Sequence, residues 1–336
     1  MACIPCEDLG GSVILKTDDD NTGSRLPEAT TGDLGSPTDS VVFVLMAGGF
    51  SPPPLGTAVG CSVLDLYLTR EQTLLDRWQW AVSTLDRAGL AGDRLCLCGG
   101  STPLPEHTPG SIKVVVDKSD YRGPAGSLRD ACEEFAPETT IIAAEAARCC
   151  TIDLARMLGR HTKSGADITV GRNADQSPSG IYILSRSTLD SVPHAGFMDL
   201  KEQWLSKLIS EGRDVRVHEL REAGALLLRT RAEFLHAMHM CSDEADHPDH
   251  AGLEPRVLSQ TRRAGSVICE GAEVAPDAVL VDSLIMPDAK IEAGALLARC
   301  IVGTGCVVRA GQEIVDAVVG PNGITYDKAS TQGAAR

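Results

Sequence analysis

The fold of this chain is decided by residues 267–323, which read VICEGAEVAPDAVLVDSLIMPDAKIEAGALLARCIVGTGCVVRAGQEIVDAVVGPNG. Aliphatic residues recur there at spacings of 6, 6 and 5, so the pattern repeats every 17 residues. Ile268, Ile285, Val302 and Val319 are therefore equivalent positions of successive repeats. The remaining aliphatic anchors are Val274, Leu280, Ile291, Leu297, Val308 and Ile314.

Small residues and turn residues fill the intervals between these anchors. Small side chains stand four positions after most anchors, at Ala272, Ala278, Ala289, Ala295 and Cys306. Such a block is typical of one flat side of a triangular coil, in which the anchor fills the axis and the small residue permits the corner. Because a single coil buries too little apolar surface, the coils must stack. The sequence thus predicts a short left-handed parallel β-helix over 265–323.

The region before the repeat alternates strand-like and helix-like segments. The run VVFVLMAGG, which begins at Val41, is apolar throughout and stops at two glycines, as a strand buried on both faces does. Further strands are expected at 94–100, 111–118, 139–146, 166–171 and 179–185. Helices are expected at 73–88, 126–135, 151–165, 201–211 and 231–240. This alternation predicts an α/β fold with a doubly wound, Rossmann-like sheet.

The expected organisation is a tail over 1–40, an α/β domain over 41–242, a linker over 243–264, the β-helix over 265–323 and a second tail over 324–336. The formal charge of −15 disfavours binding to nucleic acid, because such a surface repels a phosphate backbone. No apolar run is long enough to span a membrane, and the N-terminus lacks a signal peptide. Twelve cysteines without an export signal indicate reduced thiols and a cytoplasmic protein.

Several segments resemble the sugar-nucleotide pyrophosphorylases, nucleotidyltransferases that carry a hexapeptide β-helix at their C-terminus. The similar segments are AGG at 47–49, SVLDLYLTREQTLLDRW at 62–78, GPAG at 123–126, HTKSGADITV at 161–170, GIYILSRSTLD at 180–190, GFMDLKEQWLSKLISEG at 196–212 and LRTRAEFLHA at 228–237. The resemblance implies transfer between a nucleoside triphosphate and a mannose or glucose 1-phosphate, which gives a sugar nucleotide and pyrophosphate.

The same resemblance implies a set of site residues. The nucleotide would contact Ala47, Gly48, Gly49, Gly123, Ala125 and Gly126, and the sugar would lie near Gly180 and Asp199. Glu145 and Lys201 would be catalytic, and Glu145 would also bind Mg²⁺. A nucleoside triphosphate or sugar nucleotide is thus the expected partner, and no nucleic acid or membrane is expected to bind.

The sequence departs from the family at three points. Residues 50–61 contain no basic residue, although the corresponding loop of the family carries an Arg and a Lys. No acid stands near Leu227, where a second metal ligand is expected, and the link between Val170 and Gly180 is too short for a motif that the family has there. Losing one charged contact to a transition state costs ~10²–10³ in rate.

Two interpretations of the α/β domain therefore stay open. In the first, it is an active or divergent nucleotidyltransferase that uses other residues, among them Arg122, Arg129, Glu145, Asp199 and Lys201. In the second, it is catalytically inactive and binds a sugar nucleotide or a partner subunit as a regulator or scaffold. A third hypothesis, acyl transfer by the β-helix, is weakened because no histidine follows His250.

The remaining candidate ligands are few. Cys3 and Cys6 form a CxxC pair without a second pair, so a zinc site is not expected there. The histidine pairs, His236 with His239 and His247 with His250, are interpreted as bystanders. The exposed end coil of the β-helix predicts a homo-oligomer.

Overall fold

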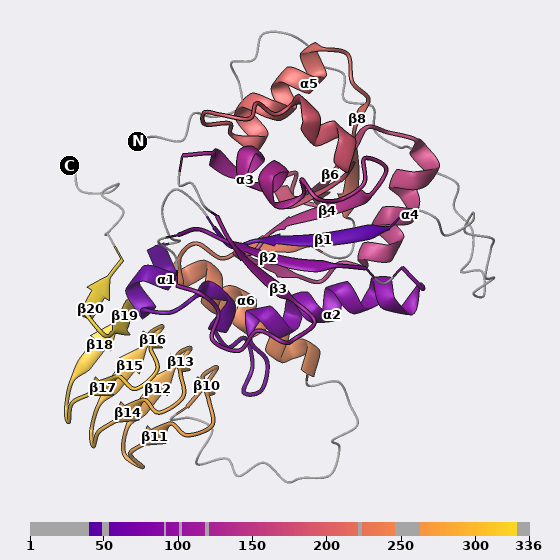
Figure 1. The fold of residues 1–336 in the computed structure, drawn as a ribbon. Helices are drawn as coiled ribbons and strands as arrows, with labels where there is room; N and C mark the ends of the chain where they lie inside the picture. The colour runs from indigo at the N-terminus through magenta and orange to yellow at the C-terminus, as the bar shows by residue number, and fades with distance from the viewer. Residues whose placement is uncertain are drawn as a thin grey trace, which may run out of the picture.

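The computed structural model describes residues 40–48, 54–90, 92–100, 103–117, 121–220, 224–245 and 263–327. Cys3, Cys6, Gly49, His247 and His250 lie outside the described residues, as do nearly all of the expected tails and linker. The described chain forms an α/β part followed by a stack of short coils (Figure 1). None of the described helices is long and apolar enough to cross a membrane.

The α/β part is built on a seven-stranded sheet with the order β3-β2-β1-β4-β7-β6-β8. Its strands are β1 (Val41–Met46), β2 (Arg94–Cys98), β3 (Lys113–Val116), β4 (Thr140–Glu145), β6 (Ile168–Asn173), β7 (Pro178–Ser185) and β8 (Val215–Leu220). The four strands β3, β2, β1 and β4 are parallel, whereas β7 is antiparallel to both β4 and β6. The sheet is mixed because only a short turn joins β6 to β7, and parallel neighbours need a long crossover.

Helices cover both faces of this sheet. Alternate residues of β1 point to opposite faces, so Phe43 and Leu45 enter one apolar core while Val42 and Val44 enter the other. The first core is covered by α2 (Leu74–Arg87), α4 (Leu154–Ser164) and α6 (Arg231–Ala245). The second is covered by α3 (Gly123–Ala131), η2 (Arg186–Ser191), the π-helical turn η3 (Leu200–Leu205) and α5 (Ser206–Ser210).

Local sequence signals fix the ends of the helices. Thr73 and Asp76 form a capping box at the start of α2, in which the side chain of each residue accepts a hydrogen bond from the backbone amide of the other. Asp153 caps α4, and Gly165 ends it with a φ of 63°. The predicted helix over 201–211 is present but begins as a π-helical turn. Short elements complete this part: α1 (Pro54–Val59), η1 (Val63–Asp65), and the pair β5 (Arg148–Cys150) and β9 (Ala225–Leu227).

The C-terminal coils form a three-sided parallel β-helix with the predicted repeat. Ile268 pairs with Ile285, Ile285 with Val302 and Val302 with Val319, so residues 17 apart stack directly on one another. One side contains β10 (Val267–Ile268), β13 (Leu284–Ile285), β16 (Ile301–Val302) and β19 (Ala317–Gly320). The second contains β11 (Glu273–Val274), β14 (Lys290–Ile291) and β17 (Val307–Val308). The third contains β12 (Val279–Val281), β15 (Leu296–Ala298) and β18 (Glu313–Val315).

The ten aliphatic anchors line the axis of the coil as predicted. After the last coil, β20 (Gly323–Tyr326) turns back antiparallel to β19. The outward side chains of the first side, among them Leu284, Ile301 and Val318, belong to the same apolar core as Leu64 and Leu68 of the α/β part. The two parts of the molecule are therefore joined by a continuous core.

A polar joint also ties α6 to one corner of the coils, which Figure 1 shows beside it. Asp282, Arg299 and Asp316 stand 17 residues apart at this corner, with φ between 47° and 54°. Arg231 at the start of α6 donates to Asp316 at 2.9 Å and to the backbone carbonyl of Arg299. Further along α6, His239 Nε2 lies 3.3 Å from a carboxylate oxygen of Asp282. One helix thus contacts successive coils.

Candidate functional site

The candidate site lies at the carboxyl ends of the parallel strands β1 and β4. Met46, the last residue of β1, is the register partner of Glu145, the last residue of β4. The next two residues of the chain after β1, Ala47 and Gly48, both donate their amides to the carbonyl of Leu97, at 2.7 and 2.9 Å. A Cβ at Gly48 would lie 2.4 Å from the amide nitrogen of Gly99, so only glycine fits there. These two predicted nucleotide-binding amides are thus already hydrogen-bonded within the protein.

Glu145 is the centre of an ion-pair cluster. One carboxylate oxygen lies 2.6 Å from Nζ of Lys201, and the other accepts a hydrogen bond of 2.8 Å from Nε of Arg148. The Arg148 side chain is only 5% exposed, whereas that of Lys201 is 38% exposed. The resemblance to a known family predicts Glu145 and Lys201 as site residues, and in the fold their side chains are in direct contact.

Arg148 is held from a second direction by β9. Its Nη1 donates to the carbonyl of Ala225 at 3.1 Å, and its register partner in the β5–β9 pair is Leu227. The guanidinium therefore fills the space between the end of β4 and β9. The sequence analysis did not identify Arg148, whose one signal is that it is the only charged residue between Ala146 and Ile152.

Gly180 packs directly against the side chains of Glu145 and Arg148. Its φ is +72°, and a Cβ there would lie 2.4 Å from Nε of Arg148 and 2.8 Å from the carboxyl carbon of Glu145. Any side chain at this position would therefore displace the ion pair. The resemblance placed Gly180 on the sugar side of the site, and the fold places it against Glu145.

The charges of the cluster keep Glu145 ionised. Burial by itself raises the pKa of the Glu145 carboxyl, but the charges of Arg148 and Lys201 outweigh it, so the pKa lies below its ordinary value. Two cations face the carboxylate of Glu145, so these three side chains together carry one positive charge. That charge favours an anionic ligand, because the nearby carboxylate of Asp199 is engaged by the amides of Lys201 and Glu202.

The residues around Glu145 do not fit Mg²⁺. This ion prefers carboxylate oxygens and water in an octahedral arrangement, and both oxygens of Glu145 are already paired with cations. The position near Leu227, where a second acid was expected, carries an apolar side chain opposite Arg148. Among the described residues, no group of three or more His, Cys, Asp or Glu side chains could hold a metal ion.

Asp199 acts as a helix cap beside the cluster. One of its carboxylate oxygens accepts hydrogen bonds from the amides of Lys201 and Glu202, at 2.8 and 2.7 Å. Its negative charge therefore faces the positive end of η3. The cap fixes the first turn of η3 and so determines the position of the Lys201 backbone, from which the side chain reaches Glu145.

The predicted nucleotide-binding residues of 123–126 form the first turn of α3 and are joined to the segment that precedes Asp199. The amide of Ala125 donates to the carbonyl of Met198 at 3.2 Å, and the amide of Met198 donates to the carbonyl of Arg122 at 3.0 Å. A Cβ at Gly123, whose φ is +69°, would lie 2.6 Å from the carbonyl oxygen of Met198. Gly126 packs similarly against the side chain of Arg122, where a Cβ would lie 2.9 Å from it.

Arg122 and Arg129 serve the fold of this region. Arg122 donates to Asp130 at 2.8 and 3.1 Å and to the backbone carbonyls of Gly196 and Pro193 at 3.1 and 2.8 Å. Arg129 donates to Asp130 at 3.1 Å and contacts the ring of His194. Both side chains are buried, so their charges are already engaged inside the protein.

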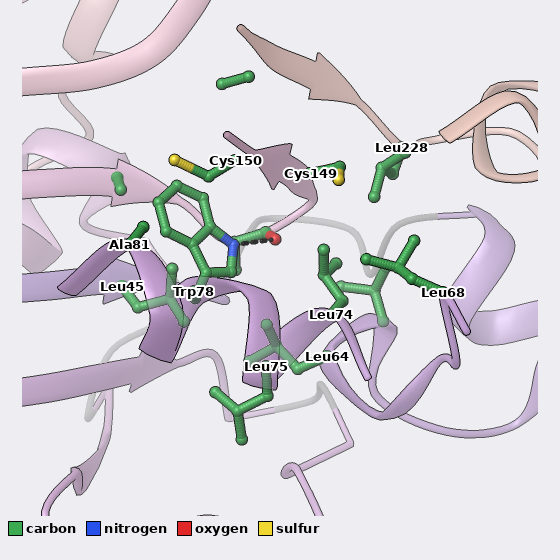
Figure 2. Close-up of a cluster of buried hydrophobic side chains, with 14 of the residues drawn as sticks. Leu45, Leu64, Leu68, Leu74, Leu75, Trp78, Ala81, Cys149, Cys150 and Leu228 are labelled. Atoms are coloured by element: carbon green, nitrogen blue, oxygen red, sulfur yellow. Dashed lines mark hydrogen bonds between the residues drawn. The ribbon is translucent and has the colours of Figure 1, made fainter. Parts of the chain in front are cut away.

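The apolar core holds the turn that carries the cluster. Trp78 of α2 donates its indole N–H to the carbonyl of Ala146 at 3.1 Å, the dashed line in Figure 2. The same carbonyl accepts the amide of Arg148 at 2.8 Å. Figure 2 shows the indole surrounded by side chains that include Leu45, Leu74 and Cys150. The turn between Glu145 and Arg148 is thus anchored to the centre of the core.

Comparison with known proteins identifies the C-terminal part. Residues 255–319 match the family model described as GlmU-like, C-terminal hexapeptide. The match covers the coils, so this segment is similar to the C-terminal hexapeptide β-helix of GlmU-like proteins. No curated protein matches the chain.

Proposed function

We propose that this protein is a catalytically inactive relative of the sugar-nucleotide pyrophosphorylases. Its α/β part, 41–242, would then be a Rossmann-like domain of the nucleotidyltransferase type that binds a sugar nucleotide, and its β-helix a scaffold. The observation that carries the proposal is the pairing of both Glu145 carboxylate oxygens with protein cations, Lys201 and Arg148.

Transfer of the nucleotidyl group from a nucleoside triphosphate to a sugar 1-phosphate, with release of pyrophosphate, needs positive charge at the phosphates as the attacking oxygen approaches. In the family that the sequence resembles, a metal ion supplies much of that charge. Here the carboxylate that would hold the ion is neutralised by the protein itself, and no basic residue stands in 50–61. We therefore expect no transfer, because several contacts that each contribute ~10²–10³ in rate are missing together.

The accessible ammonium group of Lys201 favours the binding of an anion. Its side chain is 38% exposed, and it shares Glu145 with the buried Arg148. A phosphate that approaches Lys201 meets a cluster with an excess positive charge, and Arg148 still balances Glu145 when the ammonium turns to the ligand. This arrangement supports phosphate binding without a metal ion.

The catalytic alternative has weaker support. It requires Arg122 and Arg129 to replace the missing cations of the loop, but both guanidinium groups are buried against Asp130. Freeing Arg122 would take donors from Asp130 and from the carbonyls of Gly196 and Pro193, and freeing Arg129 would take a partner from Asp130 and from His194, which is unfavourable.

Titration calorimetry with the full chain tests the proposal. UDP-glucose, GDP-mannose, ADP-glucose and glucose 1-phosphate would each be titrated in the presence of Mg²⁺ and again in EDTA. We expect at least one of them to bind with the same affinity in both buffers. Binding that requires Mg²⁺, or no binding by any of the four, would contradict the proposal.

Two lysine variants locate the binding site. Lys201→Met removes the ammonium from the cluster, and we expect it to weaken phosphate binding at least about tenfold, as for loss of a charge-assisted contact. Lys163→Met removes an exposed lysine near the end of α4 and should leave binding unchanged. Equal affinities for the two variants would place the ligand elsewhere.

A further inference from the structure

Two exposed aromatic side chains, Tyr121 and Phe197, precede the hydrogen-bonded residues Arg122 and Met198. Aromatic residues make up only 4% of the chain, and most large apolar side chains are buried. Tyr121 and Phe197 are nevertheless 73% and 48% exposed. Large exposed aromatic surface is unfavourable in water, and it frequently marks a place where a ligand binds.

The backbone beneath these two rings is firmly held. Tyr121 immediately precedes Arg122 and Phe197 immediately precedes Met198, and these two partners are joined by the hydrogen bond of 3.0 Å between them. A Cβ at Gly123 would lie 3.0 Å from Cδ2 of Phe197, so the ring packs over the backbone of the glycine. Arg122 also fixes Gly196, the residue before Phe197, through its carbonyl. A preorganised ring loses little entropy when it binds a ligand.

The same segment leads from the aromatic ring to the cationic cluster. Two residues after Phe197, Asp199 caps η3, and the first turn of that helix carries Lys201, which pairs with Glu145. A flat apolar surface and an accessible ammonium group therefore lie on one short, rigid stretch of chain. A ligand that combines a planar ring with phosphate groups matches both features.

We propose that Tyr121 and Phe197 form a stacking wall for the base of a nucleotide whose phosphates reach Lys201. This inference rests on the proposed function and adds to it a means of base recognition. Stacking uses the face of a base, which all bases share, whereas discrimination requires hydrogen bonds to the edge of the base. The wall therefore binds purine and pyrimidine sugar nucleotides with similar affinity.

The test compares ligands with and without a base on aromatic variants of the full chain. Phe197→Ala should weaken UDP-glucose, GDP-mannose and ADP-glucose about tenfold each, which is typical of losing one stacked base. Binding of glucose 1-phosphate, which has no base, should not change. Tyr121→Ala should act in the same direction, and Phe197→Tyr should restore affinity because it keeps a flat ring.

Trp80→Ala is the matched control, since Trp80 is an exposed aromatic residue of α2, 45% exposed and outside the wall. Nucleotide affinity unchanged in Phe197→Ala would overturn the stacking wall, and so would an equal loss for glucose 1-phosphate and the sugar nucleotides. If wild-type protein bound glucose 1-phosphate in either case, the proposed phosphate site would stand while the wall failed. If wild-type protein bound none of these ligands, both proposals would fail.

Discussion

Gly180 is the residue on which the geometry of the Glu145 cluster depends most directly. It combines a backbone conformation that favours glycine with a position where a Cβ would overlap Nε of Arg148. Gly165, at the end of α4, has a similar φ of +63° but no atom within 4 Å of a Cβ. Substituting alanine at Gly165 therefore measures the loss of stability from the backbone conformation alone. The same substitution at Gly180 adds the loss from the overlap of the Cβ with Arg148.

We expect Gly165→Ala to lower the free energy of unfolding by about 1–2 kcal/mol, from the left-handed conformation alone. Gly180→Ala should lower it by about 3 kcal/mol or more, because it also displaces a buried ion pair. Urea denaturation of the two variants measures the difference. Equal destabilisation would show that Gly180 is required only for its backbone conformation.

A second prediction at this scale concerns pH and Asp65. Burial raises the pKa of Asp65 from 3.8 to about 6, although the amide of Glu106 donates to the carboxylate at 3.1 Å and partly opposes the shift. Between about pH 4 and 6, the folded protein thus retains a proton that the unfolded chain has released. The contribution of Asp65 to the free energy of unfolding therefore falls as pH rises through this range.

Asp65→Asn removes this titration, so the free energy of unfolding of the variant, relative to that of the wild type, should rise as the pH increases from about 4 to 6. Denaturation in urea at several pH values measures both slopes. Glu145 titrates at lower pH with the opposite sign and affects both proteins alike. Parallel curves for the two proteins would refute the assignment.

The Glu145 cluster shows why the sequence predicted single site residues but not their arrangement. Lys201 and Gly180 could be named because they lie in segments that resemble a known family, and Glu145 because it is the acid at the end of the strand expected over 139–146. Arg148 could not, because its role comes from a strand pairing with β9, which lies more than seventy residues away in the chain. Likewise, no sequence pattern indicates that the carbonyl of Leu97 takes both amides of Ala47 and Gly48.

At the scale of elements, α2 connects the apolar core to the site. The indole of Trp78 and the amide of Arg148 share the carbonyl of Ala146, so the position of the helix determines the turn between β4 and β5. Trp80 lies on the same helix, but its side chain is exposed. This pair of tryptophans allows a matched comparison within one element.

Trp78→Phe should lower the free energy of unfolding by about 1–2 kcal/mol, from the lost hydrogen bond and the smaller ring. It should also weaken phosphate binding, because the turn that carries Arg148 loses its anchor. Trp80→Phe should change neither quantity. Thermal denaturation and calorimetry measure both effects, and identical behaviour of the two variants would argue against an anchoring role for Trp78.

The elements also differ in how far the sequence predicted them. The coils were predicted in detail because each contact of Ile285 or Val302 lies 17 residues away and repeats along the chain. The direction of β7 was not, because the expected α/β alternation favours parallel strands. Its antiparallel pairing follows from the tight turn after Asn173, in which Gln176 adopts a φ of 68°.

At the scale of the whole molecule, the β-helix is both joined to the α/β part and exposed to solvent. One of its sides enters the core that contains Leu64, and Arg231 ties a corner to α6. The other sides expose Val307 and Val315, which are 45% and 41% exposed. Every residue of β20 is exposed at the end of the coil stack, which leaves an edge strand open to pairing.

We therefore expect a homo-oligomer that forms through the coils. Sedimentation velocity at micromolar concentration should show a species larger than the 35.5 kDa chain. Ile324→Lys places a charge on the exposed strand β20 and should weaken the assembly, since charges on edge strands oppose pairing. A clean monomer for the wild-type protein would contradict this expectation.

A pyrophosphate-release assay tests most directly whether the paired state of Glu145 excludes transfer. The full chain would be incubated with Mg²⁺, each of ATP, GTP, UTP and TTP, and either glucose 1-phosphate or mannose 1-phosphate. We predict no release above the background without protein for any combination. Release with even one pair, abolished by Glu145→Gln, would show that Glu145 takes part in catalysis and that the protein is an active nucleotidyltransferase.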